Sequence, residues 1–83
     1  MSEQTLTHIV NQFRSELDGA VIGSTMLNGQ GHGVMSLQTD ASFAQIRAAL
    51  KESGGKVLFI DPVKANGWLM VTFKDMVVEG ARL

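Results

Sequence analysis

Two Asn-Gly dipeptides, at residues 28–29 and 66–67, constrain the fold of this 83-residue chain more than any other feature. Both residues of such a pair tolerate the positive φ angles of a tight hairpin turn. Each pair lies between two short runs that are rich in β-branched and other apolar residues, so each predicts a hairpin of two antiparallel strands. The four runs occupy residues 20–27, 34–39, 56–61 and 68–73.

An amphipathic helix is predicted before each hairpin. In the segment 5–17 the apolar residues fall at helical spacing, and Gly19 is the expected stop. The apolar residues of this first helix are Leu6, Ile9, Val10, Phe13 and Leu17. Asp40 or Ser42 can cap a second helix, which ends at the glycine pair 54–55. Its expected inward stripe consists of Phe43, Ile46, Ala49 and Leu50.

The fold class that follows is α+β, with two helices packed on one face of a four-stranded, mainly antiparallel sheet in the order α-β-β-α-β-β. Pro62 is expected to close the third strand, because proline cannot donate to a sheet ladder. Residues 1–83 form one domain, in which 75–83 is a candidate mobile tail, since Val77, Val78 and Gly80 disfavour a helix there.

Composition excludes several classes of function. A formal charge of −1 and a pI near 6.0 leave no basic surface for nucleic acid or for anionic lipid. The absence of cysteine excludes disulfides and thiolate chemistry. No apolar run approaches the roughly 20 residues that span a bilayer, and the polar start of the chain lacks the pattern of a signal peptide. We therefore expect no direct membrane insertion and a cytoplasmic location.

The glycine-rich loop at 29–33 is the first candidate site. Gly29, Gly31 and Gly33 could free backbone amides to approach an anion. However, position 34 is Val and the loop joins two strands, so neither the dinucleotide fingerprint nor the P-loop pattern is met. A hairpin tip explains the glycines more simply.

The titratable residues show no catalytic or metal-binding pattern. His8 and His32 are the two histidines, and neither is part of a motif with an acid or a second ligand. Asp61 precedes Pro62, and the turn-forming role of such a pair accounts for it. We therefore predict no catalytic residue, no metal site and no cofactor.

The strand that contains Trp68 suggests a protein-binding surface. If Leu69, Val71 and Phe73 face the helices, then Trp68 and Met70 lie on the other side of the sheet. On the third strand, either the pair Val57 and Phe59 or the pair Leu58 and Ile60 would join them. An apolar patch of this kind marks an interaction surface. The predicted partner-binding residues are Trp68, Met70, Phe59 and Val57.

The order of elements and two local patterns resemble the thirty-kilodalton subunit family of complex I, whose short members accompany energy-converting hydrogenases and formate hydrogenlyase. The resemblance covers residues 9–73: the segment 13–21 (FRSELDGAV) resembles a helix leading into a first strand, and 57–61 (VLFID), 66–67 and 71–73 (VTF) resemble paired strands. It implies a cofactor-free subunit that docks on the large subunit of a membrane-associated hydrogenase or NADH dehydrogenase-like complex. The chain lacks the longer C-terminal region of the respiratory family members.

A second resemblance covers mainly the latter half of the chain. The segments 34–37, 43–50 (FAQIRAAL), 55–62 (GKVLFIDP) and 78–83 (VEGARL) are similar to the short N-terminal domain of secretins and TonB-dependent receptors. That resemblance implies a periplasmic signalling domain that binds protein partners.

The main hypothesis is a non-catalytic protein-interaction subunit with a protein partner. One alternative is a small ligand-binding or catalytic domain that uses Gly29, Gly31, His32 and Gly33. Another is a homodimer formed through the same sheet face or through a sheet edge.

Overall fold

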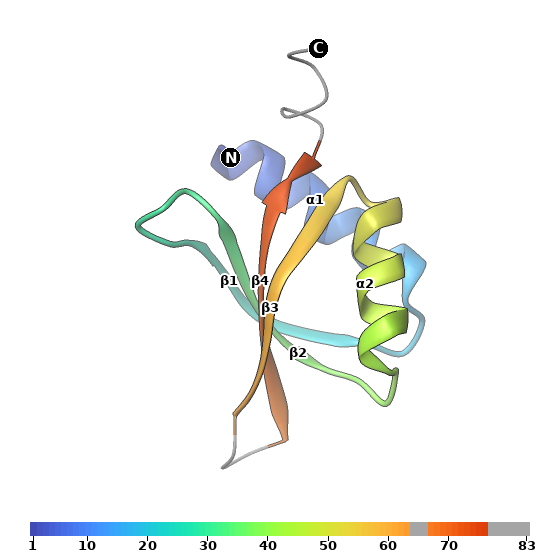
Figure 1. Cartoon of the computed structure of the whole chain (residues 1–83). Helices are drawn as coiled ribbons and strands as arrows, with labels where there is room; N and C mark the ends of the chain where they lie inside the picture. The colour runs from blue at the N-terminus through green and yellow to red at the C-terminus, as the bar shows by residue number, and fades with distance from the viewer. Residues whose placement is uncertain (64–66, 77–83) are drawn as a thin grey trace.

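The computed structural model describes residues 1–63 and 67–76 and confirms the predicted α+β fold (Figure 1). The elements are α1 (Glu3–Glu16), β1 (Val21–Leu27), β2 (Gly33–Gln38), α2 (Phe43–Glu52), β3 (Gly55–Val63) and β4 (Trp68–Asp75). All three strand pairings are antiparallel, and the spatial order of the sheet is β1-β2-β4-β3. The strands β2 and β4 are therefore central, whereas β1 and β3 form the two edges.

Both helices cover the same face of the sheet, and the core lies between them and the central strands (Figure 1). Helix α1 contributes Leu6, Ile9, Val10 and Phe13, and α2 contributes Ile46, Ala49 and Leu50. The sheet contributes Ile22, Met35, Leu37, Val71 and Phe73. Because strand side chains alternate between faces, the burial of these sheet residues fixes which face each strand residue occupies.

Serine side chains begin both helices. The Ser2 hydroxyl accepts a hydrogen bond from the Thr5 backbone N–H, so α1 starts before the predicted Thr5. Ser42, and not Asp40, caps α2, and it forms a capping box with Gln45. Phe43 is the first residue of α2 and is 42% exposed, so its predicted place in the inward stripe was wrong.

The first hairpin turn differs from the one that its Asn-Gly pair predicts. Five residues, 28–32, connect β1 to β2, and the positive φ angle falls on Gly31 (+77°) and not on Asn28 or Gly29. In the second hairpin Gly67 has a φ of +75°, while residues 64–66 of the predicted turn lie outside the described residues.

Strand β3 continues through Pro62 to Val63, so the prediction that Pro62 closes it was wrong. Proline is tolerated there because β3 is an edge strand, where the missing N–H can face away from the sheet. The pairing register with β4 shifts between Val57 and Phe59, which leaves Leu58 as the extra residue of a β-bulge.

The backbone of Gly33 lies against the core, and this contact yields a stability prediction. A Cβ atom on Gly33 would lie 2.7 Å from Phe73 Cζ and 2.9 Å from Leu6 Cδ1, and both side chains are buried. Gly33→Ala should therefore lower the free energy of unfolding by about 1–3 kcal/mol in urea denaturation, because a packed core resists an added methyl group. Gly29→Ala is the control: nothing lies within 4 Å of its Cβ position, and we expect a change within about 0.5 kcal/mol.

Candidate functional site

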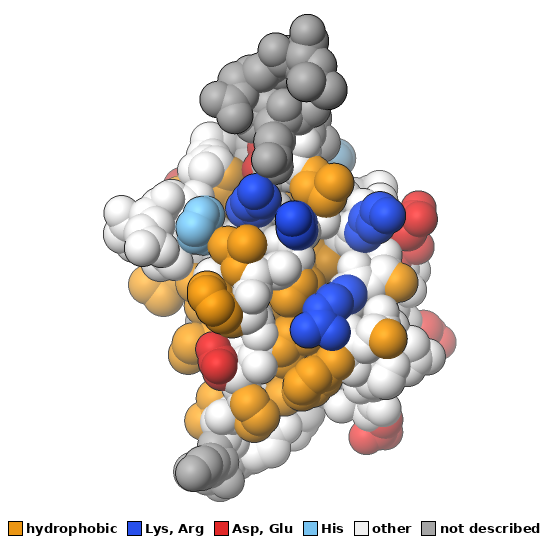
Figure 2. All heavy atoms as spheres, viewed as in Figure 1, with side chains coloured by type: hydrophobic (Ala, Val, Ile, Leu, Met, Phe, Trp, Pro, Cys, Tyr) orange, Lys and Arg blue, Asp and Glu red, His pale blue; other side chains and the backbone are white. Residues whose placement is uncertain are grey.

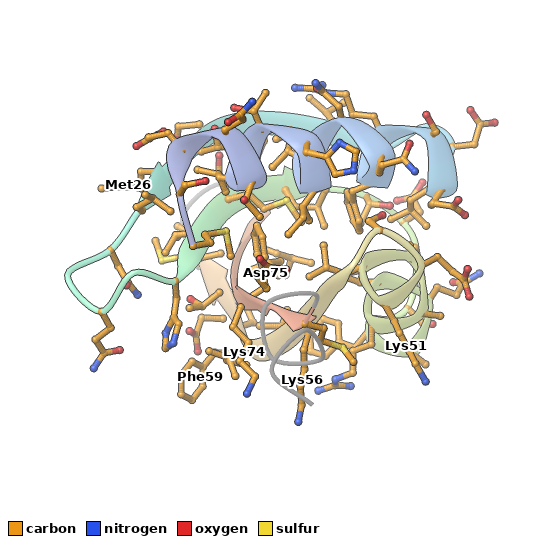
Figure 3. The ribbon with its side chains drawn as sticks, turned by 90° about the horizontal axis from the view of Figure 1, so that it is seen from above. Met26, Lys51, Lys56, Phe59, Lys74 and Asp75 are labelled. Atoms are coloured by element: carbon orange, nitrogen blue, oxygen red, sulfur yellow. The ribbon has the colours of Figure 1, made fainter. Side chains whose placement is uncertain are left out.

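The face of the sheet opposite the helices, called the open face below, carries exposed apolar side chains from both edge strands and from β4. Cross-strand pairing puts Met26, Val34, Thr72 and Phe59 in one row across this face. Figure 3 shows Met26 and Phe59 projecting on the side of the sheet away from α2. The large apolar residues of this face that are most exposed are Val21 (50%), Met26 (59%), Phe59 (62%) and Met70 (45%).

Trp68 lies on this face and is only partly exposed. Its ring reaches from β4 over β2 to β1, where a Cβ atom on Gly23 would lie 3.2 Å from Trp68 Cζ3. Because Gly23 has no side chain, it leaves space on β1 for the indole from β4. Aromatic rings often cover a strand glycine in this way. The indole therefore forms part of the floor of the open face.

A hydroxyl-mediated contact holds β1 and β2 together beneath the indole. The pairing register of β1 shifts between Ile22 and Thr25, and within this irregularity the Ser24 N–H donates to Ser36 Oγ at 2.8 Å. The Ser36 side chain thus accepts a hydrogen bond from a backbone N–H that the irregular strand pairing leaves without a backbone partner.

The structure separates the predicted partner-binding residues. Trp68, Met70 and Phe59 lie on the open face, where Met70 pairs with Asp61 and Phe59 pairs with Thr72. Val57 pairs with Phe73 and packs against the core, so the prediction that Val57 shares a face with Phe59 was wrong. The bulge at Leu58 is the cause, because one extra residue changes which face the following side chains occupy.

The glycine-rich loop is internally hydrogen-bonded. Asn28 Oδ1 accepts from the backbone N–H groups of Gln30 (2.9 Å) and His32 (3.0 Å), and the Gly31 N–H donates to the Asn28 carbonyl. The amides of Gln30, Gly31 and His32 are therefore already engaged. Gly33 lies outside this loop, as the first residue of β2. The structure thus puts Gly29, Gly31 and His32 in an internally hydrogen-bonded turn.

No cluster of three or more metal-ligating side chains occurs within residues 1–63 and 67–76. His8 is on α1 and His32 is in the β1–β2 turn, so the fold does not unite the two histidines on one element. In the described part of the chain, no helix has the length and hydropathy required to cross a bilayer.

A pocket between α2 and β3, called the basic groove below, was not predicted from the sequence. It has a volume of about 410 Å³ and is lined by Arg47, Lys51, Gly55, Lys56, Val57 and Met76. Its cations come from two elements, Arg47 and Lys51 from α2 and Lys56 from β3. In the sequence these residues show only as outward-facing positions of a helix and of a strand, and nothing there indicates that they meet. Val21 and Met26 of the open face were also missed, because β1 lacks a clear alternation of apolar and polar residues.

No protein-family model, no curated protein and no solved structure matches this chain.

Trp68 is the single tryptophan, and the chain has no tyrosine, so its fluorescence reports on the open face alone. Gly23→Ala should move the emission maximum to longer wavelength, because the new methyl group would displace the indole toward solvent; its Cβ would also lie 2.5 Å from Ser36 Oγ. Gly29→Ala should leave the emission unchanged. An unshifted spectrum for a folded Gly23→Ala protein would contradict the packing of Trp68 over Gly23.

The carboxamide of Asn28 should stabilise the first hairpin turn. Asn28→Ala removes the acceptor of two backbone N–H groups, and we expect the free energy of unfolding to fall by about 1–2 kcal/mol in thermal or urea denaturation. Gln30→Ala keeps both hydrogen bonds, since Gln30 takes part through its backbone N–H, and should be nearly neutral. Equal stability of the two variants would show that the turn does not depend on the carboxamide.

Proposed function

We propose that this protein is a non-catalytic interaction module that binds a protein partner through the open face of its sheet. The observation that carries the proposal is the exposure of Val21, Met26, Phe59 and Met70 on one side of one sheet. An antiparallel sheet with one face in water usually has polar residues there, because exposed apolar side chains gain nothing from solvent. A partner that covers this face would bury them.

The arrangement of the open face suits docking. Its exposed apolar side chains lie on the same face as the partly exposed indole of Trp68, and large aromatic and methionine side chains are enriched where protein interfaces are most buried. The hydrogen-bonded Ser24 and Ser36 keep the strands beneath it in place, so binding requires little further ordering.

The sequence resemblance to the thirty-kilodalton subunit family of complex I supplies the candidate class of partner, the large subunit of a membrane-associated redox complex. The glycine-rich turn gives less support to the ligand-binding alternative, since the amides of Gln30, Gly31 and His32 are already hydrogen-bonded to Asn28.

A matched pair of phenylalanine variants tests the proposal. Phe59→Ser removes an apolar side chain from the open face, where it is 62% exposed, while Phe43→Ser removes one from α2, where it is 42% exposed. The immobilised protein is incubated with cell extract, and captured proteins are quantified by mass spectrometry. We expect Phe59→Ser to lower capture of the specific partner about tenfold and Phe43→Ser to leave it unchanged, because a buried aromatic contact contributes about 1–2 kcal/mol to binding.

Equal capture by both variants would contradict docking through the open face. Light scattering across a concentration range addresses the homodimer alternative: a molar mass that rises to twice the monomer value, and falls back in Phe59→Ser, would identify a second copy of the chain as the partner. A strictly monomeric protein that captures nothing would refute the interaction role.

A further inference from the structure

The basic groove has a composition that the overall charge of the protein does not suggest. The chain has 7 Lys and Arg against 8 Asp and Glu, yet among the described residues that line the groove three of six are cations and none is acidic. Figure 2 shows Lys and Arg side chains gathered around an apolar strip on the side that carries β3 and α2. Arg47 and Lys51 come from α2, and Lys56 comes from β3.

Strand pairing adds a further positive charge next to the groove. Lys56 lies directly opposite Lys74 of β4, and Figure 3 shows the labelled side chains of Lys51, Lys56 and Lys74 along the side of the molecule away from α1. Positive charges that gather within one Debye length, about 8 Å at physiological salt, act together on an approaching anion. Asp75 lies opposite Gly55 in the same register, so the positive charge of the groove comes from Arg47, Lys51 and Lys56. These three cations favour a ligand with several negative charges over one with a single charge.

The outer edge of β3 provides backbone hydrogen-bonding groups in the same groove. The Met76 N–H donates to the Gly54 carbonyl at 3.0 Å, and the register continues through Gly55↔Asp75, Lys56↔Lys74 and Val57↔Phe73. Opposed residues in an antiparallel pair alternate between hydrogen-bonded and non-hydrogen-bonded positions. Gly54 and Lys56 therefore direct their N–H and C=O groups toward β4, whereas Gly55 and Val57 direct theirs outward, beside α2.

The same alternation defines how far the usable edge extends. Beyond the bulge, Phe59 pairs with Thr72 and Asp61 with Met70, so Ile60 and Pro62 direct their backbones outward. Pro62 has no N–H to offer, so it ends the row of donors. The bulge at Leu58 interrupts this row between Val57 and Ile60, and Gly55 is buried, so the accessible outward backbone groups in the groove are those of Val57.

We propose that the basic groove binds an acidic, extended segment of a partner protein, which lies along the outer edge of β3. Its backbone pairs with Val57, and its carboxylates contact Arg47, Lys51 and Lys56. Main-chain pairing with an edge strand beside a helix supplies affinity, and the side-chain contacts supply the preference for acidic sequences. The groove adjoins the open face, because Lys56 pairs with Lys74, two residues from Thr72 on β4. Arg47 and Lys51 belong to α2, on the other side of the sheet, and the proposal does not depend on docking through the open face.

The probe is a fluorescein-labelled peptide of about eight residues that alternates glutamate and valine, with a glutamine–valine peptide as its neutral counterpart. Fluorescence anisotropy should give saturable binding of the acidic peptide and about tenfold weaker binding of the neutral one. Raising the salt concentration from about 0.05 M to about 0.5 M should lower the affinity for the acidic peptide several-fold, because salt screens its carboxylates from the cations. Equal binding of the two peptides, or none, overturns the proposal.

Charge-reversal variants locate the site. Arg47→Glu and Arg14→Glu change the total charge equally, but Arg14 lies on α1, away from the groove. Arg47→Glu should lower the affinity for the acidic peptide about fivefold to tenfold, and Arg14→Glu should lower it less than about twofold. Met26→Ser, at the far edge of the open face, should leave peptide affinity unchanged. The same substitution should weaken partner binding through the open face, so the two proposals can fail independently. Equal losses for the two arginine variants would mean that the peptide senses only net charge, which overturns the site.

Amide hydrogen exchange followed by NMR separates strand addition from binding through charge alone. Saturating acidic peptide should slow exchange of the Val57 amide about tenfold or more, because it gains a hydrogen bond. Val57→Pro should abolish binding, since it removes an outward donor while sparing the ladder to β4. If that variant does not fold, as judged by circular dichroism, the exchange of the wild-type Val57 amide decides: peptide binding without its protection overturns backbone pairing with β3.

Discussion

Burial of a single sheet face under both helices is the constraint on which the rest of this structure depends. Phe73 and Val71 on β4, and Met35 and Leu37 on β2, are fully enclosed, so the register of the central strands is fixed by which residues must leave water. A slip of one residue would exchange the two faces of a strand. The same constraint leaves the second face without a cover, and this is why its apolar residues are exposed.

The elements of the fold could be predicted from local patterns, because each helix has a clear apolar stripe and each strand is bounded by turn residues. The errors arose where tertiary position overrides local preference. Pro62 would end a central strand, but β3 is an edge strand and the chain continues through it. Phe43 has the spacing of a core residue, but it is the first residue of α2, where the helix has not yet come over the sheet core.

The open face could be predicted only in part, because of the bulge at Leu58. Alternation correctly separates Trp68 and Met70 from Val71 and Phe73 on β4, but on β3 it fails at Leu58, where the bulge shifts the register. Such a bulge has no reliable signature in a run of apolar residues such as 57–60. The basic groove was harder still to predict, because Arg47 and Lys56 become neighbours only when α2 and β3 pack together.

The irregularity in β1 has a consequence for the size of any assembly built by strand addition. Ser24 turns its amide toward Ser36 inside the sheet, so the ladder of β1 is interrupted near its middle, while the bulge at Leu58 and then Pro62 interrupt the other edge. Open-ended fibres require two uninterrupted edges that match each other. A chain with two interrupted edges can instead accept a guest segment over a short stretch and then stop, which keeps such a complex finite and discrete.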